Sequence, residues 1–210
     1  MNIKENISII KENALKAELV VVTKHQRINV IKEVYKLGEK NFGENRVQDL
    51  VKKHSQLPKD IKWHMIGHLQ KNKVKHLAPF IYMIQSVDSI ELLEKINQEA
   101  QKNKRKIKCL IQYKISEEKN KFGFQKEEID RLLNSNYCNN YKYVKIEGLM
   151  AMASFSKKEI QIEKEFQKIN NLFKDIKLTK KTLSIGMSND YRIACKWGST
   201  MIRIGSFIFN

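Results

Sequence analysis

The chain has 210 residues, of which 41% are hydrophobic and 30% charged, and its formal net charge is +17. This composition is too apolar for a disordered chain and too charged for a membrane protein, and the length allows a sizeable core. Only Pro58 and Pro79 interrupt the chain and no Gly/Ser-rich linker divides it, so we expect a single domain over residues 1–210.

The sequence carries no evident signal for secretion or membrane insertion. Its longest apolar runs, Leu19–Thr23 and Met201–Phe209, have the length of strands, and acids and a lysine break the N-terminal apolar pattern. Cys109, Cys138 and Cys195 are widely spaced and form no C-x-x-C motif, which argues against a disulfide framework or a zinc ribbon. We therefore expect a cytoplasmic protein that does not enter a membrane.

An amphipathic helix over Ile3–Ala17 is followed by strand and helix patterns in regular alternation. The predicted strands cover residues 19–24, 41–44, 62–67, 82–87, 107–115, 144–152, 182–188 and 201–209. The predicted helices between them cover Ile28–Leu37, Val47–His54, Lys71–Ala78, Ser89–Gln101, Lys126–Asn134, Glu159–Phe173 and Asn189–Lys196.

Strict alternation of strand and helix implies parallel strands joined by right-handed crossovers, and eight such strands close a (β/α)8 TIM barrel. The alternative is a doubly wound open sheet, which would normally place a Gly-rich turn after its first strand, where this sequence has no glycine. The chain stops after the eighth strand, so we expect the N-terminal helix to cover that side of the barrel.

Lys24 ends the first predicted strand, whose other residues are almost all apolar. The chemistry of such barrels lies at the C-terminal ends of the strands, so this lysine would point into the barrel mouth. It would be desolvated there and available as a neutral amine for a Schiff base. A solvated lysine that begins an ordinary loop is the alternative.

Two pairs of Gly and Ser mark the ends of the last two strands: Gly186 with Ser188, and Gly205 with Ser206. Small residues let the backbone approach an anion, while N–H and hydroxyl groups donate hydrogen bonds to it. The loops after the seventh and eighth strands commonly hold phosphate in these barrels. The two pairs together predict a phosphate site.

Arg203 lies in the otherwise apolar eighth strand, close to Ser206. A cation that faces the barrel interior needs a partner, such as a ring nitrogen or a carboxylate of a phosphate-bound group. Strand alternation equally allows an arginine that faces outward between the covering helices. A lysine at the barrel mouth, a phosphate site and a cation for a ring nitrogen together suggest pyridoxal phosphate.

Nucleic acids and metals are disfavoured as ligands. The positive charge is nearly all lysine, spread from Lys4 to Lys196 and mixed with Glu, whereas arginine is the usual reader of bases and phosphates. A Lys-rich nucleic-acid binder is thus a minor hypothesis, and we expect no specific nucleic-acid partner. His64 and His68 are four apart, but Gly67 and the predicted strand break the helical spacing of a metal pair, so we expect no metal site.

Several segments in chain order carry a resemblance to one family: VVTK (21–24), FGENRVQD (42–49), WHMIGHLQKNK (63–73), GLMAM (148–152), SIGMSND (184–190) and GSTMIRIGS (198–206). On these segments the chain resembles the pyridoxal phosphate homeostasis protein family, relatives of the barrel domain of alanine racemase. The resemblance implies a single (β/α)8 barrel of the alanine racemase N-terminal type, here with an extra N-terminal helix and a shortened C-terminus.

The same resemblance implies roles for particular residues. An arginine that faces the pyridine nitrogen opposes protonation of the ring, so the cofactor becomes a poorer electron sink. Lys121, in an N-x-K-x-G stretch, would be a secondary cofactor contact. The implied cofactor-binding residues are Lys24 (internal aldimine), Asn45 (ring pocket), Ser188, Gly205 and Ser206 (phosphate) and Arg203 (pyridine nitrogen).

By this resemblance the protein would bind pyridoxal 5'-phosphate and contribute to vitamin B6 homeostasis, buffering or supplying the cofactor without strong catalysis and without catalytic residues. The second domain from which alanine racemase draws a catalytic tyrosine has no counterpart here, so we expect a monomer with transient contacts to apo-enzymes that use the cofactor. The alternative is a small amino-acid racemase or lyase dependent on pyridoxal phosphate. Such an enzyme needs an acid/base opposite Lys24, and only His64 or a tyrosine could supply it.

Overall fold

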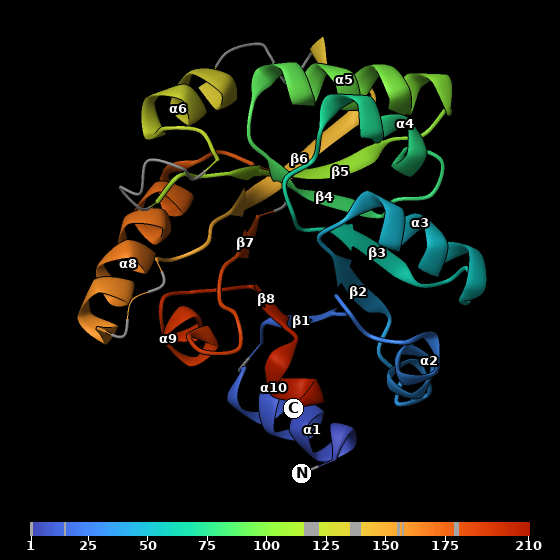
Figure 1. Cartoon of the computed structure of the whole chain (residues 1–210). Helices are drawn as coiled ribbons and strands as arrows, with labels where there is room; N and C mark the ends of the chain where they lie inside the picture. Colours follow the sequence, from blue (N-terminus) through green and yellow to red (C-terminus); the bar gives the residue numbers. More distant parts are fainter. Residues whose placement is uncertain are drawn as a thin grey trace.

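Eight parallel strands close into a barrel in the order β1 to β8, which confirms the predicted (β/α)8 fold (Figure 1). The computed structural model describes residues 2–14, 16–115, 122–134, 140–154, 156, 158–178 and 181–210. Each strand pairs with the next one along the chain, and β8 closes the barrel against β1. The strands are β1 (Glu18–Val22), β2 (Asn41–Glu44), β3 (Lys62–Met65), β4 (Met83–Val87), β5 (Ile107–Gln112), β6 (Val144–Met150), β7 (Thr182–Ser184) and β8 (Met201–Ile204).

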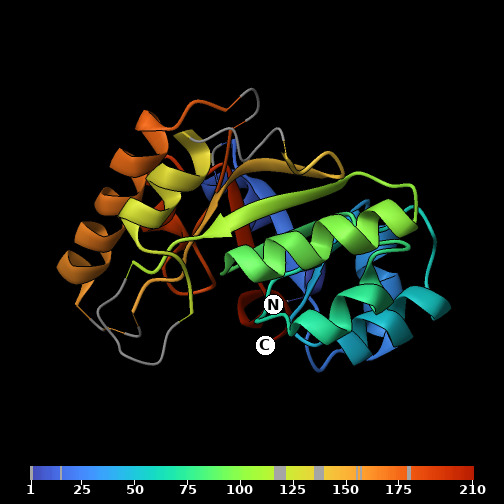
Figure 2. The ribbon, with the colours of Figure 1, turned by 90° about the horizontal axis from the view of Figure 1, so that it is seen from above.

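Helices connect the strands and lie around the outside of the barrel, as Figures 1 and 2 show. The N-terminal helix ends at Asn13 rather than at the predicted Ala17. The other predicted helices agree with the structure to within two residues at each end. The helical elements are α1 (Ile3–Asn13), α2 (Ile28–Lys36), α3 (Val47–Gln56), the 3-10 turn η1 (Lys71–Lys73), α4 (Val74–Leu77), α5 (Ile90–Lys102), α6 (Lys126–Asn134), α8 (Glu159–Asp175), α9 (Tyr191–Lys196) and α10 (Ser206–Phe209).

The predicted end of the eighth strand is wrong, because β8 ends at Ile204 and the next residues form α10. The alternating apolar residues of 201–209 resemble a strand. However, β1 pairs with β8 only as far as Val21 opposite Ile204, and β1 itself ends at Val22. Since β1 offers no further backbone to pair with, the chain turns into a helix.

Helix α1 packs against α10, and the two ends of the chain lie side by side in both ribbon views (Figures 1 and 2). A capping box starts α1: the Asn2 side chain accepts from the Glu5 N–H at 2.9 Å, and the Glu5 carboxylate accepts from the Asn2 N–H. Further along, the buried Asn6 amide donates to the carbonyl of Ile208 at 3.1 Å. The N-terminal helix therefore covers the side of the barrel that follows β8, as predicted.

Buried side chains form two separate clusters. The larger one fills the space between the strands and the surrounding helices, while a small one comprises Val20, Met83, Leu110, Met150 and Met201, from five different strands. Because strand residues alternate between the two faces of the sheet, the small cluster lies inside the barrel and the large one outside it. Polar side chains share the interior, and they matter for the site described below.

A bulge lies in the pairing of β5 with β6, where Cys109 is opposite Ile146 and Leu110 is opposite Gly148. The glycine has a φ of +154°, and a Cβ added there would lie 1.9 Å from the carbonyl oxygen of Thr182. Any side chain at this position would collide with the backbone of β7. Gly148 therefore lets β6 and β7 approach each other closely at the bulge.

The described residues contain neither a metal cluster nor a membrane-spanning helix. No three His, Cys, Asp or Glu side chains among them are grouped so that they could hold a metal ion. None of the helices in the described ranges is long and apolar enough to cross a bilayer. Cys109 and Cys195 are buried and free, and burial raises the pKa of both thiols, whereas Cys138 lies outside the described residues.

Candidate functional site at the C-terminal end of the barrel

Lys24 follows the end of β1 in a turn, and its side chain is exposed. The prediction of a desolvated lysine that ends the first strand is therefore wrong in this respect. The strand ends two residues earlier, at Val22, and His25 adopts a φ of +64° as the chain turns towards α2. The amine of Lys24 is thus accessible at the barrel mouth rather than sealed inside it.

A buried ion pair lies directly behind Lys24, between the barrel and α3. The ammonium group of Lys53 pairs with Oε1 of Glu44 and donates to the carbonyl of Thr23 at 2.7 Å. The Thr23 hydroxyl donates to the same carboxylate oxygen at 2.5 Å. All three side chains are buried, so these contacts fix the backbone immediately before the turn of Lys24.

Asn45 follows β2 and is exposed at the same end of the barrel. It packs closely against the turn that follows β3, because a Cβ added at Gly67 would lie 2.4 Å from the carbonyl oxygen of Asn45. The Ser86 hydroxyl also donates to the carbonyl of Gly67, at 2.6 Å. These contacts join the loops after β2 and β3 to each other and to strand β4 at the mouth.

The predicted phosphate residues come together after β7 and β8. The Ser188 hydroxyl oxygen lies 3.4 Å from the backbone nitrogen of Gly205 and 3.3 Å from that of Phe207, and it accepts from both. Ser206, between these two, is exposed. The result is a cluster of hydroxyl and backbone N–H groups of the kind that binds a phosphate.

Two glycines allow this cluster to form. Gly186 has a φ of +98°, and a Cβ there would lie 2.7 Å from the Cβ of Ala194 in α9. A Cβ at Gly205 would lie 3.0 Å from the carbonyl oxygen of Val22, the last residue of β1. The second contact joins the end of β8 to the end of β1, so the phosphate-type donors and the Lys24 turn begin at adjacent strand ends.

Arg203 points into the barrel, and the alternative of an outward-facing arginine is wrong. Its Nη1 donates to the carbonyl of Ser184 at 2.7 Å and to the Ser184 hydroxyl at 2.6 Å, and its Nη2 donates to the carbonyl of Ala151 at 2.9 Å. The Ser184 hydroxyl in turn bonds to Gln85 at 2.7 Å. Because β7 and β4 are not neighbours in the barrel, this last bond crosses the interior.

The charge state of Arg203 follows from its surroundings. Burial lowers the pKa of the guanidinium to about 10, and Asp190 opposes that shift, so the group is still a cation at neutral pH. Its three hydrogen bonds use three of five N–H donors. The described residues provide no partner for the other two, which could therefore serve a ligand.

Sequence reasoning missed the polar residues behind Arg203. The sequence singled out His64 as a metal ligand with His68 and as an acid/base opposite Lys24, but it is fully buried in the barrel and forms hydrogen bonds at both ring nitrogens. Gln85 and Ser184, also fully buried, were not singled out from the sequence. Each of the three strands carries a polar side chain among buried residues, and a buried polar side chain needs a hydrogen-bond partner. The alternation of residues along a strand does not show which partner that is.

The loop after β3 also contacts the segment that follows β5. The rings of His68 and Phe122 stack with centroids 3.9 Å apart, and Nδ1 of His68 lies 2.7 Å from a carboxylate oxygen of Asp88. A cavity of about 120 Å³ lies here, bordered by these two rings, Tyr113 and Met152 among others. The predicted secondary contact, Lys121, lies outside the described residues.

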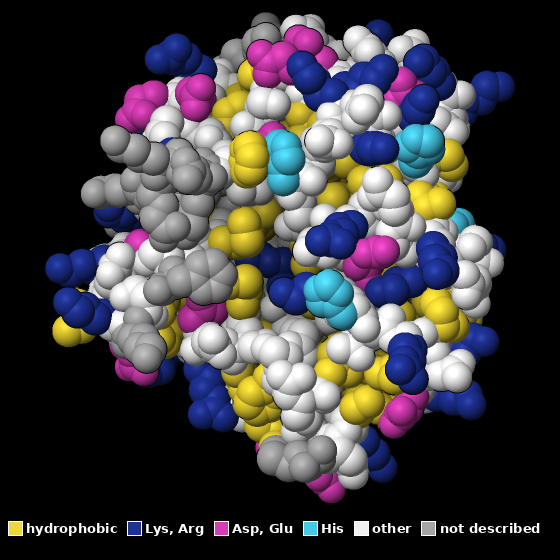
Figure 3. All heavy atoms as spheres, viewed as in Figure 1, with side chains coloured by type: hydrophobic (Ala, Val, Ile, Leu, Met, Phe, Trp, Pro, Cys, Tyr) yellow, Lys and Arg dark blue, Asp and Glu magenta, His cyan; other side chains and the backbone are white. Residues whose placement is uncertain are grey.

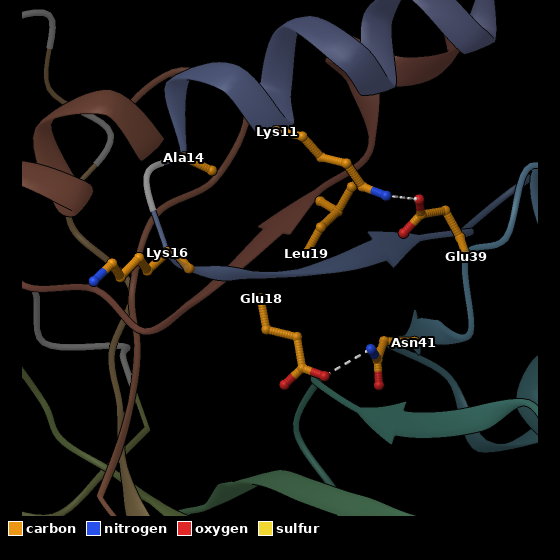
Figure 4. A pocket seen from close by; sticks show the side chains of 8 residues that line it. Lys11, Ala14, Lys16, Glu18, Leu19, Glu39 and Asn41 are labelled. Carbon is orange, nitrogen blue, oxygen red and sulfur yellow. Dashed lines mark hydrogen bonds and ion pairs between the residues drawn. The ribbon is translucent and has the colours of Figure 1, made fainter.

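The face of the molecule seen in Figure 3 is hollowed near its centre, and Lys and Arg side chains gather there. A second cavity, of about 330 Å³, lies where β1 and β2 begin, at the N-terminal end of the barrel (Figure 4). In it Lys11 pairs with Glu39 at 2.5 Å, and Asn41 donates to Glu18 at 2.8 Å. This cavity is separated from Lys24 by the length of β1.

Comparison with known proteins agrees with this geometry. The alanine racemase N-terminal domain family matches residues 1–210. The pyridoxal phosphate homeostasis protein of Haemophilus influenzae is 34% identical over 100% of this chain and 95% of its own length. The human protein of the same name is 35% identical over 93% of this chain and 77% of its own length.

A solved structure shows the same relationship in three dimensions. PipY of Synechococcus elongatus PCC7942, with PLP bound, superposes with a TM-score of 0.89 at 28% identity, and all of both chains is covered. Sequence and structure thus agree over the full length of the chain. The chain belongs to the pyridoxal phosphate homeostasis protein family, whose barrel is of the alanine racemase N-terminal type.

Proposed function

We propose that this protein binds pyridoxal 5'-phosphate at the C-terminal end of the barrel, with residues 1–210 acting as one cofactor-binding domain. The observation that carries the proposal is the contact of Gly205 with Val22. It sets an accessible amine, Lys24, and a cluster of phosphate-type donors at adjacent strand ends. Relatives named for pyridoxal phosphate homeostasis, and a structure with PLP bound, support it.

The residues present fit this cofactor. Pyridoxal phosphate supplies an aldehyde, which condenses with a primary amine to form a C=N bond and releases one water. We assign the amine to Lys24. We assign the phosphate to the cluster formed by Ser188, Gly205 and Ser206, and the edge of the ring pocket to Asn45.

Arg203 gives the proposed site its chemical character. The two N–H groups for which the described residues provide no partner would face the pyridine nitrogen, and a cation that donates there leaves the nitrogen without a proton of its own. A ring in that state stabilises carbanions poorly. We therefore propose that the protein buffers or supplies the cofactor, in line with the homeostasis role in the relatives' names, and does not catalyse strongly.

Partners and location complete the proposal. We expect a monomer that contacts apo-enzymes transiently, lies in the cytoplasm and binds no specific nucleic acid. The cytoplasmic location is inferred from the sequence, chiefly from cysteine usage. A secondary contact from Lys121 is also part of the proposal. Each of these points stays a prediction.

The test is an absorbance titration of the purified protein with pyridoxal phosphate. The wild type should develop the band of a lysine-bound cofactor, and Lys24→Ala should lose it. Lys32→Ala, which removes an exposed lysine of α2, is the matched control and should behave like the wild type. A band that survives in Lys24→Ala would refute the assignment, and rapid racemisation of an amino acid by the loaded wild type would refute the carrier role.

A further inference from the structure

The interior of the barrel contains an unbroken chain of hydrogen-bonded side chains that reaches from one end to the other. It begins at Glu18, the first residue of β1, and ends at Arg203 in β8. The successive bonds are Arg203 Nη1 to Ser184 Oγ at 2.6 Å, Ser184 Oγ to Gln85 Oε1 at 2.7 Å, Gln85 Nε2 to His64 Nδ1 at 2.9 Å, His64 Nε2 to Asn41 Oδ1 at 3.2 Å and Asn41 Nδ2 to Glu18 Oε1 at 2.8 Å.

The charged groups at the two ends of this hydrogen-bond series determine the direction of every hydrogen bond in it. A guanidinium group can only donate, so the Ser184 oxygen accepts from Arg203 and its hydroxyl proton goes to Gln85. A carboxylate can only accept, so Asn41 donates its amide N–H to Glu18 and presents its carbonyl oxygen to His64. All donors therefore point away from the cation and towards the anion.

This polarity leaves one protonation state for His64. Its Nδ1 must accept from the Gln85 amide and its Nε2 must donate to Asn41, which is the neutral ring protonated at Nε2. A second proton on Nδ1 would face an N–H of Gln85 and break the chain. Burial, with Lys62 and Lys108 nearby, also lowers the pKa of His64 to about 3.

This series of hydrogen bonds explains how the guanidinium group of Arg203 is held in place. Ser184 contacts it directly, and the Ser184 hydroxyl is oriented by Gln85 from the far side of the barrel. Gln85 is in turn oriented by His64 and by a 3.2 Å contact with the sulfur of Met201. Without Gln85, the hydroxyl of Ser184 could rotate, and one of the three hydrogen bonds that fix the direction of the Arg203 guanidinium would be weakened.

We infer that Gln85 and His64 are positioning residues for cofactor binding: through Ser184 they aim the Arg203 N–H groups that have no partner among the described residues at the ring of the bound cofactor. This inference rests on the proposed function, because it takes Arg203 to face the pyridine nitrogen. It goes further by placing control of the ring's electronic state on two side chains that never touch the cofactor.

The variant that tests the inference is Gln85→Leu, which keeps the bulk of the side chain and removes all three of its hydrogen bonds. We expect it to bind pyridoxal phosphate about tenfold more weakly, the effect of one net hydrogen bond. The absorbance maximum of the bound cofactor, and the pH at which it changes, should both shift. Asn97→Leu is the control. It removes an amide side chain that accepts from the backbone N–H of Tyr143 and takes no part in the hydrogen-bond chain, so it should leave the spectrum unchanged.

A second measurement needs no cofactor. The ¹⁵N shifts of His64 in the apo-protein should report a proton on Nε2 alone from pH 5 to pH 8, and Gln85→Leu should keep this tautomer, because Glu18 still orients the Asn41 carbonyl oxygen towards Nε2. A proton on Nδ1 in the wild type, or a wild-type spectrum of bound cofactor in Gln85→Leu, would overturn the inference. A wild type that never forms the cofactor band would instead refute the proposed function, and with it the positioning role.

Discussion

The buried pair of Lys53 and Glu44 offers the sharpest test of what holds the Lys24 turn in place. Lys53→Met keeps the length of the side chain but leaves the fully buried Glu44 carboxylate without its cation. Breaking a buried ion pair in this way costs about 3–5 kcal/mol. In a chain of this size that loss lowers the melting temperature by roughly 10 °C.

Thermal unfolding followed by circular dichroism measures this effect. The control is Lys52→Met, which removes the neighbouring exposed lysine of the same helix and should leave the melting temperature nearly unchanged. The double variant Glu44→Gln with Lys53→Met should recover most of the loss, because a neutral amide can still accept from the Thr23 hydroxyl. If Lys53→Met lowered the free energy of unfolding by less than about 1 kcal/mol, the buried pair would contribute no more to stability than an exposed ion pair does, which would refute this reasoning.

Two further predictions concern stability. Gly148→Ala should lower the free energy of unfolding by more than about 4 kcal/mol or prevent folding, because its Cβ would meet the backbone of β7. Gly38→Ala, which has open space around a φ of +96°, should lower it by only about 1–2 kcal/mol. Equal losses in urea unfolding would contradict this prediction. His64 has a pKa of about 3 in the folded state and 6.5 in the unfolded chain. Between these two pH values the unfolded state binds one more proton than the folded state, so the stability of the fold decreases as the pH falls through this range. The free energy of unfolding should decrease by about 1 kcal/mol more from pH 6 to pH 5 in the wild type than in His64→Gln, while the exposed control His76→Gln keeps the wild-type slope. An equally steep dependence in His64→Gln would refute the assignment.

The regular alternation of patterns was sufficient to predict the barrel. Apolar runs rich in β-branched residues, such as that of β1, separated by amphipathic helices, leave few other arrangements for eight parallel strands. The errors lie at the strand ends. The predicted strands over 107–115, 144–152 and 182–188 all run past the observed ones, because the strand-like residue pattern continues where the site loops begin, although the regular strand ladder has ended there.

The candidate site was predictable only in part. Lys24, Ser188 and Ser206 could be singled out because their chemistry is recognisable at the ends of strands, where ligands bind in this fold. The pairing of Glu44 with Lys53 could not be, since it depends on how α3 packs behind β2. The series of hydrogen bonds from Glu18 to Arg203 could not be predicted either, because it joins strands on opposite sides of the barrel and no spacing along the sequence encodes it.

We propose that one amine, among the many lysines of this chain, binds pyridoxal phosphate covalently. Reduction of the loaded protein with borohydride, followed by peptide mass spectrometry, tests it most directly, because reduction converts the C=N bond into a stable single bond at the site where it formed. We expect a pyridoxyl group on Lys24 at one equivalent per chain, abolished in Lys24→Ala. A label spread over surface lysines, or placed mainly on another lysine, would contradict it.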